Sequence, residues 1–336
     1  MRAAIFESFR APLQIAEVPD PDCPPDGAII DVKACGVCRS DWHAWSGADP
    51  DVVAPHVPGH EFSGLVLEVG PKCNRFKPGD RVTAPFIVAC GSCSDCLGGD
   101  ATLCDDQHII GFSSWGAFAE YVAIPHADFN LVPLPEILDF VPAAGLGCRV
   151  TTAYRGLVER AQLQPGEWLA VHGCGGIGLA ATMIASALGA SVIAIDIKDD
   201  ALEIAARLGA TKTLNATGLN DVGSAVRDLT KGGAQVSVDA LGVTETLLNS
   251  LASLDKLGRH VQIGMPTGSH AEPKIPILDL VYARQLTIHG TRGLAASRFP
   301  KLFQMIESGR LDPSRLVTKT IALEAAGNAM AEMDKF

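Results

Sequence analysis

One short stretch decides the fold of this chain: Trp168-Leu-Ala-Val-His-Gly-Cys-Gly-Gly-Ile-Gly178. It joins an apolar strand, Trp168–His172, to an apolar helix through the pattern G-x-G-x-x-G, and this context makes the pattern specific. Glycines let the backbone turn tightly and approach a pyrophosphate, and a helix N-terminus offers free N–H groups and a partial positive charge. The stretch therefore predicts a dinucleotide-binding fingerprint, in which the cofactor is held by Gly173, Gly175, Gly176, Ile177 and Gly178.

An acidic residue follows at the place where such a fingerprint needs one. The strand Ser191–Ile195 ends at Asp196, and a carboxylate there accepts hydrogen bonds from the ribose hydroxyls and repels a 2′-phosphate. The sequence therefore favours NAD over NADP, although Lys198 partly offsets the charge of Asp196. The alternative interpretation is a glycine-rich turn beside an ordinary aspartate at a strand end.

Outward from this stretch, short apolar strands alternate with helical segments, which predicts a doubly wound parallel sheet covered on both faces. The predicted strands are Leu169–His172, Val192–Ile195, Val236–Ala240, Val261–Gly264 and Leu286–His289, and the predicted helices include Leu179–Leu188 and Ala201–Leu208. Mixed helix and strand should follow to the end of the chain. Before Thr151, runs such as Ala28–Val32 and Ser63–Val69 are cut by Pro and Gly and predict a compact β-rich unit.

Length and charge narrow the possible classes of protein. A chain of 336 residues favours two domains, and its net charge of −11 argues against a nucleic-acid surface, which needs clustered Lys and Arg. Residues 168–195 lack charged side chains, but their five glycines fit a buried strand, turn and helix better than a membrane span. The amino terminus has no apolar core of a signal peptide, so we expect a cytoplasmic protein with reduced cysteines.

Four cysteines lie within fifteen residues, in C-G-S-C-S-D-C-L-G-G-D-A-T-L-C. Cys90, Cys93, Cys96 and Cys104 can close a tetrahedron of thiolates around one zinc ion, and such a closed shell is typical of a structural site. The alternatives are four free thiols or two disulfides. A zinc ribbon that binds DNA does not fit, because Lys and Arg are absent from Ile87 to Asp106.

Three further potential metal ligands are far apart in the sequence. Cys38 lies in G-V-C-R-S-D-W-H, His60 lies in P-G-H-E-F, and Cys148 lies in G-L-G-C-R-V-T-T. With C-G-x-C-x-x-C-x₇-C and the glycine fingerprint followed by Asp196, these motifs stand in a specific order at specific distances. Over nearly its whole length the chain resembles the zinc-dependent medium-chain alcohol dehydrogenase family.

The resemblance implies a fold and a division of the chain. A GroES-like β-rich catalytic domain would comprise residues 1–149 and 292–336 and would carry the four-cysteine lobe at about 88–106. A Rossmann domain that binds NAD would comprise residues 150–291. Family chains often run beyond an ending such as Met333–Phe336 and close with another strand, so this sequence is either trimmed or naturally short.

The resemblance also assigns metal ligands. Cys38, His60 and Cys148 would hold a catalytic zinc ion, the second of two per subunit, and would leave a fourth position for water or substrate. Asp41 would fix the tautomer of His60 from behind. Glu61 would be an acid beside the metal that can approach it.

The family's other roles fall on residues near these ligands. Arg39 would face the cofactor pyrophosphate, and Thr152 would touch the nicotinamide side. Ser40 would bond the substrate oxygen, and His43 would end a proton relay that leads to solvent.

The implied reaction is a reversible hydride transfer between a primary or secondary alcohol and NAD, which gives an aldehyde or ketone. Trp42 and Phe86 would line the substrate pocket, and Ser40, smaller than the threonine of many relatives, favours branched or secondary alcohols. The alternatives are a polyol, threonine or other zinc-dependent dehydrogenase, and a non-catalytic cofactor-binding protein. The family also implies a homodimer or homotetramer, formed through the edge of the cofactor-domain sheet near Leu286–Gly290, with no membrane or nucleic-acid partner.

Overall fold

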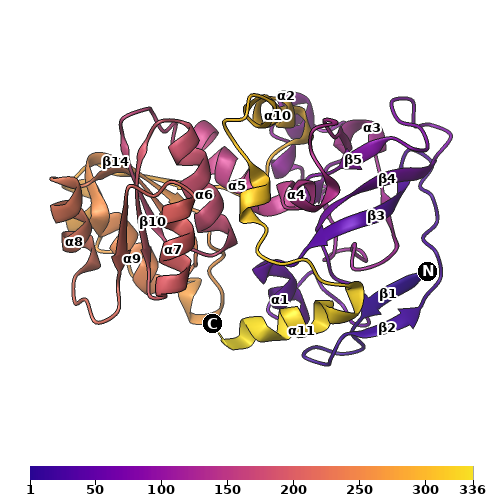
Figure 1. The fold of residues 1–336 in the computed structure, drawn as a ribbon, viewed down its shortest axis with the longest axis horizontal. Coiled ribbons are helices and arrows are strands. Elements are labelled where there is room, and N and C mark those ends of the chain that lie inside the picture. The colour runs from indigo at the N-terminus through magenta and orange to yellow at the C-terminus, as the bar shows by residue number, and fades with distance from the viewer. Residues whose placement is uncertain (336) are drawn as a thin grey trace. The chain divides into compact units, whose positions relative to one another are not determined.

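Two large sheets of different kinds organise this chain in a computed structural model that describes residues 1–335 (Figure 1). Met1–Thr151 and the residues from Gly293 onward form one compact unit, which is built on a five-stranded antiparallel sheet. Thr152–Arg292 form a second unit, which is built on a six-stranded parallel sheet. We call them the β unit and the α/β unit.

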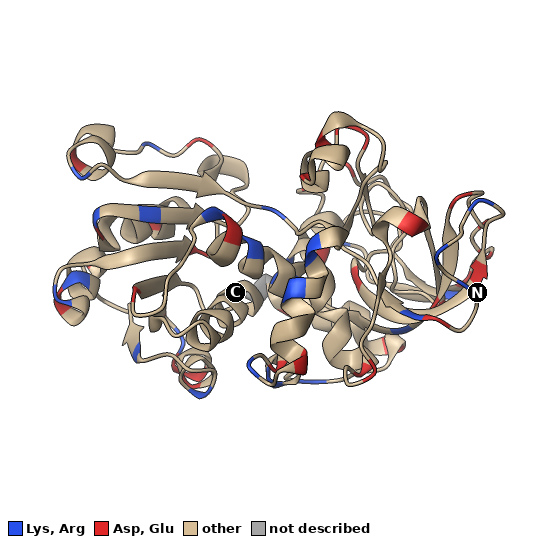
Figure 2. Cartoon of the chain, turned by 90° about the horizontal axis from the view of Figure 1, so that it is seen from above, with Lys and Arg blue, Asp and Glu red and all other residues tan. Residues whose placement is uncertain are grey.

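Charged residues are dispersed over both units. In Figure 2, Lys and Arg lie interspersed with Asp and Glu rather than gathered along one element. The net charge of the whole sequence is −11. No helix among residues 1–335 is both long enough and apolar enough to cross a membrane.

The α/β unit confirms the predicted doubly wound parallel sheet. Its strands are β10 (Trp168–His172), β11 (Ser191–Asp196), β12 (Lys212–Asn215), β13 (Ala234–Asp239), β14 (Leu254–Gln262) and β15 (Thr287–Gly290). They lie in the order β12-β11-β10-β13-β14-β15, and all neighbours are parallel. The order reverses between β10 and β13, so the carboxyl ends of these strands form the switch point at which sheets of this kind bind ligands.

Helices cover both faces of this sheet. The regular ones are α6 (Gly176–Ala187), α7 (Asp199–Arg207), α8 (Val222–Thr230) and α9 (Thr244–Ser253), and shorter ones are α5 (Thr151–Tyr154), η3 (Arg155–Arg160), η4 (Gly268–His270) and η5 (Ile277–Tyr282). α6 packs with α7, and α8 packs with α9, one pair on each face (Figure 1). Right-handed crossovers require this arrangement, because the strand order runs one way to β12 and the other way from β13.

The predicted strand limits differ most from the structure at β13 and β14; β15 was predicted one residue too early, and β12 was not predicted. β13 ends at Asp239 rather than Ala240, and β14 covers Leu254–Gln262 rather than Val261–Gly264. The N–H groups of Ile263 and Gly264 both donate to the carbonyl oxygen of Asp239, which turns the chain out of the sheet. The first half of β14 is mostly polar or exposed, so the apolar pattern marks only its end.

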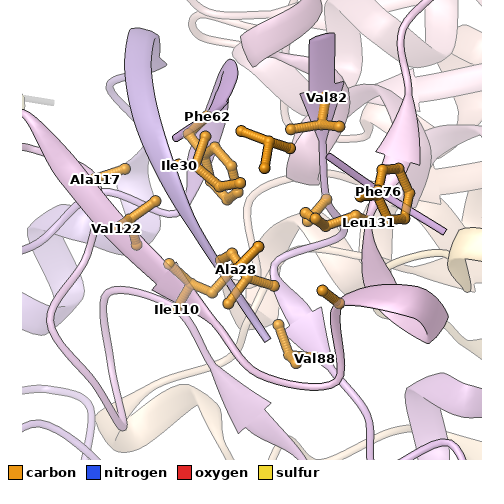
Figure 3. Packing of buried hydrophobic residues seen from close by; sticks show 14 residues of the cluster. Ala28, Ile30, Phe62, Phe76, Val82, Val88, Ile110, Ala117, Val122 and Leu131 are labelled. Atoms are coloured by element: carbon orange, nitrogen blue, oxygen red, sulfur yellow. The ribbon is translucent and has the colours of Figure 1, made fainter. Parts of the chain in front are cut away.

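The predicted β-rich unit is also confirmed. Its strands are β1 (Arg2–Ile5), β2 (Gln14–Glu17), β3 (Ala28–Gly36), β4 (Glu61–Val69), β5 (Arg81–Thr83), β6 (Ile87–Val88), β7 (His108–Ile109), β8 (Tyr121–Ile124) and β9 (Val132–Pro133). The main sheet has the order β8-β3-β4-β5-β9, while β1 pairs with β2 and β6 pairs with β7. Alternate side chains from β3, β4 and β5, among them Ile30, Phe62 and Val82, meet in one hydrophobic core (Figure 3). This core fixes the register of β3 against β4, which pairs Gly36 with Glu61.

The remaining elements of the β unit are short. They are α1 (Arg39–Ser46), α2 (Ser94–Gly98), η1 (Ala101–Leu103), α3 (Ala127–Asn130), α4 (Phe140–Ala144), η2 (Leu146–Val150), η6 (Ala296–Arg298), α10 (Phe299–Glu307), η7 (Pro313–Leu316), η8 (Leu323–Ala325), α11 (Ala326–Ala331) and η9 (Glu332–Lys335). The expected strand after β15 is wrong for the described residues: between Thr291 and Lys335 the chain forms helices and irregular segments only. Residues 317–322 lie between helices but pair with no strand. Phe336 lies outside the described residues.

Candidate metal and cofactor sites

The four cysteines of the lobe surround one point in the β unit. Cys90 Sγ lies 3.9 Å from Cys96 Sγ, and Cys93 Sγ lies 3.8 Å from Cys104 Sγ. A tetrahedral zinc ion with Zn–S bonds of about 2.3 Å places its sulfurs about 3.8 Å apart, whereas the sulfurs of a disulfide are about 2.05 Å apart. The two-disulfide alternative is therefore not formed, and the spacing fits one tetrahedral ion.

Hydrogen bonds favour the thiolate form of Cys90 in this lobe, whereas burial raises the pKa of Cys96 to about 12 and also raises the pKa of Cys104. The Ser92 hydroxyl and N–H lie 3.5 Å from Cys90 Sγ, and the Cys93 N–H lies 3.4 Å from it. Hydrogen bonds from Ser92 and Cys93 lower the pKa of Cys90 to about 6. Since thiolates are the form that binds zinc, Cys90 is the cysteine of the lobe that is best prepared to bind a metal ion.

The second candidate set comes from three separate segments of the β unit. Cys38 follows β3, His60 precedes β4, and the pairing of β3 with β4 brings these two residues together. Cys148 lies in the π-helical turn η2 (Leu146–Val150). There Gly147 allows a close approach, since an added Cβ would lie 3.3 Å from the carbonyl oxygen of His60. We call Cys38, His60 and Cys148 the three-ligand set. Their ligand atoms and a carboxylate oxygen of Glu61 all lie within 4.8 Å of one another.

His60 is oriented from behind by a buried carboxylate. Its Nδ1 lies 2.7 Å from Oδ1 of Asp41, and both side chains are fully buried. Asp41 also accepts the N–H of Cys38 at 2.8 Å and of Gly59 at 3.1 Å. Because a carboxylate can only accept, Nδ1 carries the proton, and in the neutral ring Nε2 presents its lone pair. That Nε2 is buried and has no hydrogen-bond partner within residues 1–335, as expected of a nitrogen placed to bind a metal ion.

The two cysteines of the three-ligand set shift each other's pKa in opposite directions. A hydrogen bond from Cys148 lowers the pKa of Cys38 well below its usual value, and the same contact raises the pKa of Cys148 well above it. One thiolate is thus favoured before any ion binds. The donor set of two sulfurs and one imidazole nitrogen is one that zinc accepts in catalytic sites.

Glu61 has a partner that sequence reasoning missed. Arg149 Nε donates to Oε1 at 3.0 Å and to Oε2 at 2.9 Å, Arg149 Nη2 forms an ion pair with Oε2, and the backbone N–H of Arg149 donates to Oε1 at 3.0 Å. Glu61 is fully buried. One signal was present in the sequence, since a buried acid beside His60 needs a cation and Arg149 directly follows Cys148.

Helix α1 carries five of the predicted site residues, including Asp41. Ser40 and His43 are half-buried on it, and His43 Nδ1 is buried without a hydrogen-bond partner within residues 1–335. Arg39 is exposed, lies 3.8 Å above the ring of Trp42, and donates to the carbonyl oxygen of Met333. Its contact with a cofactor stays a prediction.

Two aromatic rings flank the imidazole of His60. Phe86 meets it edge-on with ring centroids 5.8 Å apart, and Phe112 does so at 5.4 Å. Phe86 was among the predicted pocket residues and Phe112 was not. No motif marks Phe112, which reaches the site through the fold of the segment after β7.

The glycine fingerprint has the local geometry that its pattern predicts. Gly173 adopts φ of 95°, which other residues rarely adopt, and an added Cβ at Gly178 would lie 1.8 Å from the Gly173 carbonyl oxygen. Gly175 caps α6, and an added Cβ there would meet nothing within 4 Å. Gly176 and Ile177 begin the helix. The turn is tight where the chain packs on itself and open where a pyrophosphate would lie.

The carboxylate of Asp196 stabilises the glycine turn through hydrogen bonds to backbone N–H groups. Its Oδ2 accepts the N–H of Cys174 at 2.7 Å, and its Oδ1 accepts the N–H groups of Ile197 at 2.8 Å and Lys198 at 3.0 Å. Lys198 therefore contributes a backbone contact as well as the charge that the sequence indicated. Thr152, the first residue of the α/β unit, is buried in α5.

Comparison with known proteins gives two family matches. An alcohol dehydrogenase GroES-like domain matches residues 24–136, and a zinc-binding dehydrogenase domain matches residues 176–308. An alcohol dehydrogenase of Geobacillus stearothermophilus is 38% identical over 283 residues, which are 84% of this chain and 82% of that protein. An NAD-dependent alcohol dehydrogenase of Sulfurisphaera tokodaii is 33% identical over 347 residues, 100% of this chain and 97% of that protein.

A solved structure agrees over the full length. Alcohol dehydrogenase TADH from Thermus sp. ATN1 matches with a TM-score of 0.90 and 34% identity, and the match covers 100% of this chain and 97% of that one. A GroES-like unit followed by a doubly wound sheet with a glycine fingerprint defines a two-domain dehydrogenase. The chain belongs to the zinc-dependent medium-chain alcohol dehydrogenase family.

Proposed function

We propose that this protein is an NAD-dependent zinc alcohol dehydrogenase that transfers a hydride reversibly between a primary or secondary alcohol and NAD, giving an aldehyde or ketone. The observation that carries the proposal is the buried Nε2 of His60, which has no hydrogen-bond partner within residues 1–335 and lies beside the thiols of Cys38 and Cys148. A buried polar nitrogen without a partner is costly, and a metal ion would satisfy it.

Two zinc ions per subunit are proposed. The lobe of Cys90, Cys93, Cys96 and Cys104 would close a structural shell, and its sulfur spacings support this. The three-ligand set would hold the second ion, which when bound supplies Lewis acidity that stabilises negative charge on the substrate oxygen.

Residues around the three-ligand set would orient the substrate and move its proton. Ser40 Oγ would take the hydrogen bond of the substrate hydroxyl, and His43 would take up the released proton. Burial and then the charge of Arg39 lower the pKa of His43, so its imidazole is neutral and ready to accept near neutral pH. Phe86 and Trp42 would shape the pocket and exclude water.

The fingerprint is proposed to bind NAD, which supplies the hydride acceptor. The open space at Gly175 and the N-terminus of α6 would receive the pyrophosphate, with Gly173, Gly176, Ile177 and Gly178 forming the turn. Arg39 and Thr152 would contact the cofactor, in the roles that the family resemblance assigns to them. The carboxylate of Asp196 would accept from the adenosine ribose.

Asp196 provides a test of cofactor preference. Asp196→Asn removes the charge but keeps an oxygen for the N–H of Cys174. We expect the ratio of kcat/KM for NADP to that for NAD to rise roughly tenfold or more, because like charges about 4 Å apart at a protein surface repel by a few kcal/mol. An unchanged ratio would show that Asp196 does not face the ribose.

The reaction is tested by the initial rate of NADH formation with primary alcohols, secondary alcohols and polyols, run in parallel with NADP and with metal analysis of reduced protein. We expect turnover with NAD on a primary or secondary alcohol and about two zinc ions per chain, as the two ligand sets imply. Turnover confined to polyols or threonine would assign the alternative dehydrogenase class. Tight NAD binding without turnover would indicate a non-catalytic role. Reduced protein that contains no zinc would contradict the proposal.

Domain limits, assembly and location are also proposals. We propose a catalytic domain at 1–149 and 292–336 and a cofactor domain at 150–291, and the division into Met1–Thr151 with Gly293 onward and Thr152–Arg292 supports these limits. We propose a homodimer or homotetramer joined through β15. Ten cysteines without a disulfide support a cytoplasmic location, where thiols stay reduced.

A further inference from the structure

We propose that Arg149 is a positioning residue that holds the Glu61 carboxylate away from the three-ligand set and so keeps the fourth metal position open for substrate. The inference rests on the proposed function, because it needs a zinc ion at Cys38, His60 and Cys148. It concerns a residue to which the family resemblance assigns no role.

The structure offers four donors where an open zinc site needs three. A carboxylate oxygen of Glu61 lies within 4.8 Å of the ligand atoms of Cys38, His60 and Cys148. Four protein ligands close a zinc ion into a structural site, whereas three ligands leave a position for substrate. Whether this site can turn over therefore depends on what else binds Glu61.

Arg149 occupies both oxygens of that carboxylate. The guanidinium donates to Oε1 and Oε2, and the backbone N–H of the same residue adds a third contact, to Oε1. Nη2 of Arg149 also donates to the carbonyl oxygen of Val37 at 2.8 Å, which ties the guanidinium to the segment just before Cys38. Two-point contacts of this kind fix both distance and orientation, and a lysine could not reproduce them.

The chain leaves room for this pair. An added Cβ at Gly36 would lie 2.3 Å from Oε2 of Glu61 and 3.2 Å from Nη2 of Arg149. Only glycine at this position allows the carboxylate to lie along β3 against the guanidinium. The pair is thus built into the end of β3, where Gly36 pairs with Glu61 of β4.

Removing the guanidinium of Arg149 would leave the Glu61 carboxylate without its cationic partner. Glu61 is fully buried, and a buried carboxylate without a cation is unstable. The nearest remaining cation would be the zinc ion. A cavity of about 380 Å³ borders Glu61 and Arg149 together with Gly36 and Val37, so a shorter or apolar side chain at position 149 can be accommodated without overpacking.

The experiment compares wild type, Arg149→Met, Glu61→Gln and the double variant after zinc is replaced by cobalt(II). The visible spectrum of cobalt(II) reports coordination number and donor type, and azide serves as a probe that binds an open metal position. Since the four thiolates of the lobe are the same in every variant, difference spectra isolate the three-ligand set. Metal content is measured for each sample.

The expected result is a spectral change in Arg149→Met with azide affinity reduced at least about tenfold, the size of effect known for residues that support metal ligands. The double variant should regain the wild-type spectrum and azide affinity, because Glu61 can no longer bind the metal. Loss of packing alone would not be relieved by a second substitution, so this recovery separates positioning from a structural effect. Failure of the double variant to recover would overturn the inference.

Glu61→Gln alone keeps the test valid if Arg149→Met does not fold. A cobalt(II) spectrum equal to that of wild type is expected, since Glu61 is already held off the metal, and a changed spectrum would show that Glu61 binds the metal in wild type and would overturn the inference. The matched control is Arg259→Met, which removes an arginine of similar exposure paired with Glu167 at 2.5 Å and should change neither readout. If wild type itself binds metal only in the lobe, the proposed function fails instead.

Discussion

Asp41 shows how single residues prepare the proposed metal site. It is a fully buried carboxylate, and each of its contacts supports a residue of the three-ligand set or its neighbour: His60 Nδ1 and the N–H groups of Cys38 and Gly59. Burial of such a charge is tolerated because both oxygens accept hydrogen bonds, Oδ1 from His60 and Gly59 and Oδ2 from Cys38. Asp41 therefore couples the position of one ligand to the orientation of another.

Asp41→Asn should lower zinc affinity roughly 10- to 100-fold, because an outer partner of a ligating histidine fixes its tautomer and basicity. The measurement is competition of the three-ligand set with a calibrated zinc chelator. Asp128→Asn is the matched control, since Asp128 also accepts two backbone N–H groups, from Asn74 and Arg75, in the same unit. Equal losses in both variants would remove the specific role of Asp41.

At the scale of elements, strand pairing and tight turns place the chemistry. The register of β3 against β4 sets Cys38 beside His60, and η2 adds Cys148 because Gly147 permits close approach. In the α/β unit, β10 runs through the centre of the sheet and delivers Gly173 to the switch point. β10 ends in a buried histidine, His172, whose Nε2 lies 3.0 Å from Ser253 Oγ.

His172 should make the stability of the α/β unit depend on pH. Burial, and then the neighbouring His260, lower the pKa of His172 from 6.5 to about 3. Between pH 6.5 and about pH 3, His172 binds a proton in the unfolded chain but not in the folded chain. The free energy of unfolding should therefore fall as pH falls from 6.5 towards 3, by about 1.4 kcal/mol per pH unit from this residue.

His172→Leu removes that contribution. Urea titrations at several pH values between 6.5 and 4.5 should show a shallower loss of stability in the variant. Ser253 keeps a partner in the carbonyl oxygen of Asn249 at 2.7 Å, so no buried hydroxyl is left unsatisfied. Effects of metal release at low pH are common to both proteins and cancel in the comparison. Parallel slopes would contradict the assignment.

At the scale of the whole molecule, the parallel sheet ends in an open edge. β15 pairs with β14 on one side and is the last strand in the order of the sheet. Most of β15 is exposed, and Ile288 on it is 42% exposed. A strand with unpaired N–H and C=O groups invites pairing with a second copy.

Ile288→Lys should shift the protein from a dimer or tetramer towards smaller species, because a lysine on an edge strand opposes pairing of two edges. Sedimentation velocity over a range of concentrations measures this. The matched control is Leu219→Lys in the same unit, where Leu219 is 41% exposed but lies outside the sheet. A monomeric wild type, or identical behaviour of both variants, would exclude β15 as the interface.

Much of this architecture was predictable because its signals are local. The parallel sheet follows from short apolar strands that alternate with helices, but β12 was not predicted, the limits of β13 and β14 were misplaced, and β15 was predicted one residue too early. The strand predicted after β15 was wrong because residues 317–322 have no neighbour to pair with, and pairing cannot be read from one segment. Arg149 was missed for the same reason, since its contact with Glu61 joins residues 88 positions apart.

The sequence by itself determined the fingerprint and the cysteine lobe. In each, the spacing of residues within a few turns of chain dictates the geometry, through the backbone freedom of Gly173 or the short loops between Cys90 and Cys104. Only the tertiary structure decided which oxygens of Glu61 are occupied and which nitrogen of His60 is left without a partner within residues 1–335. These depend on the register of β3 against β4 and on the approach of η2, which are set by the packed core and not by any one segment.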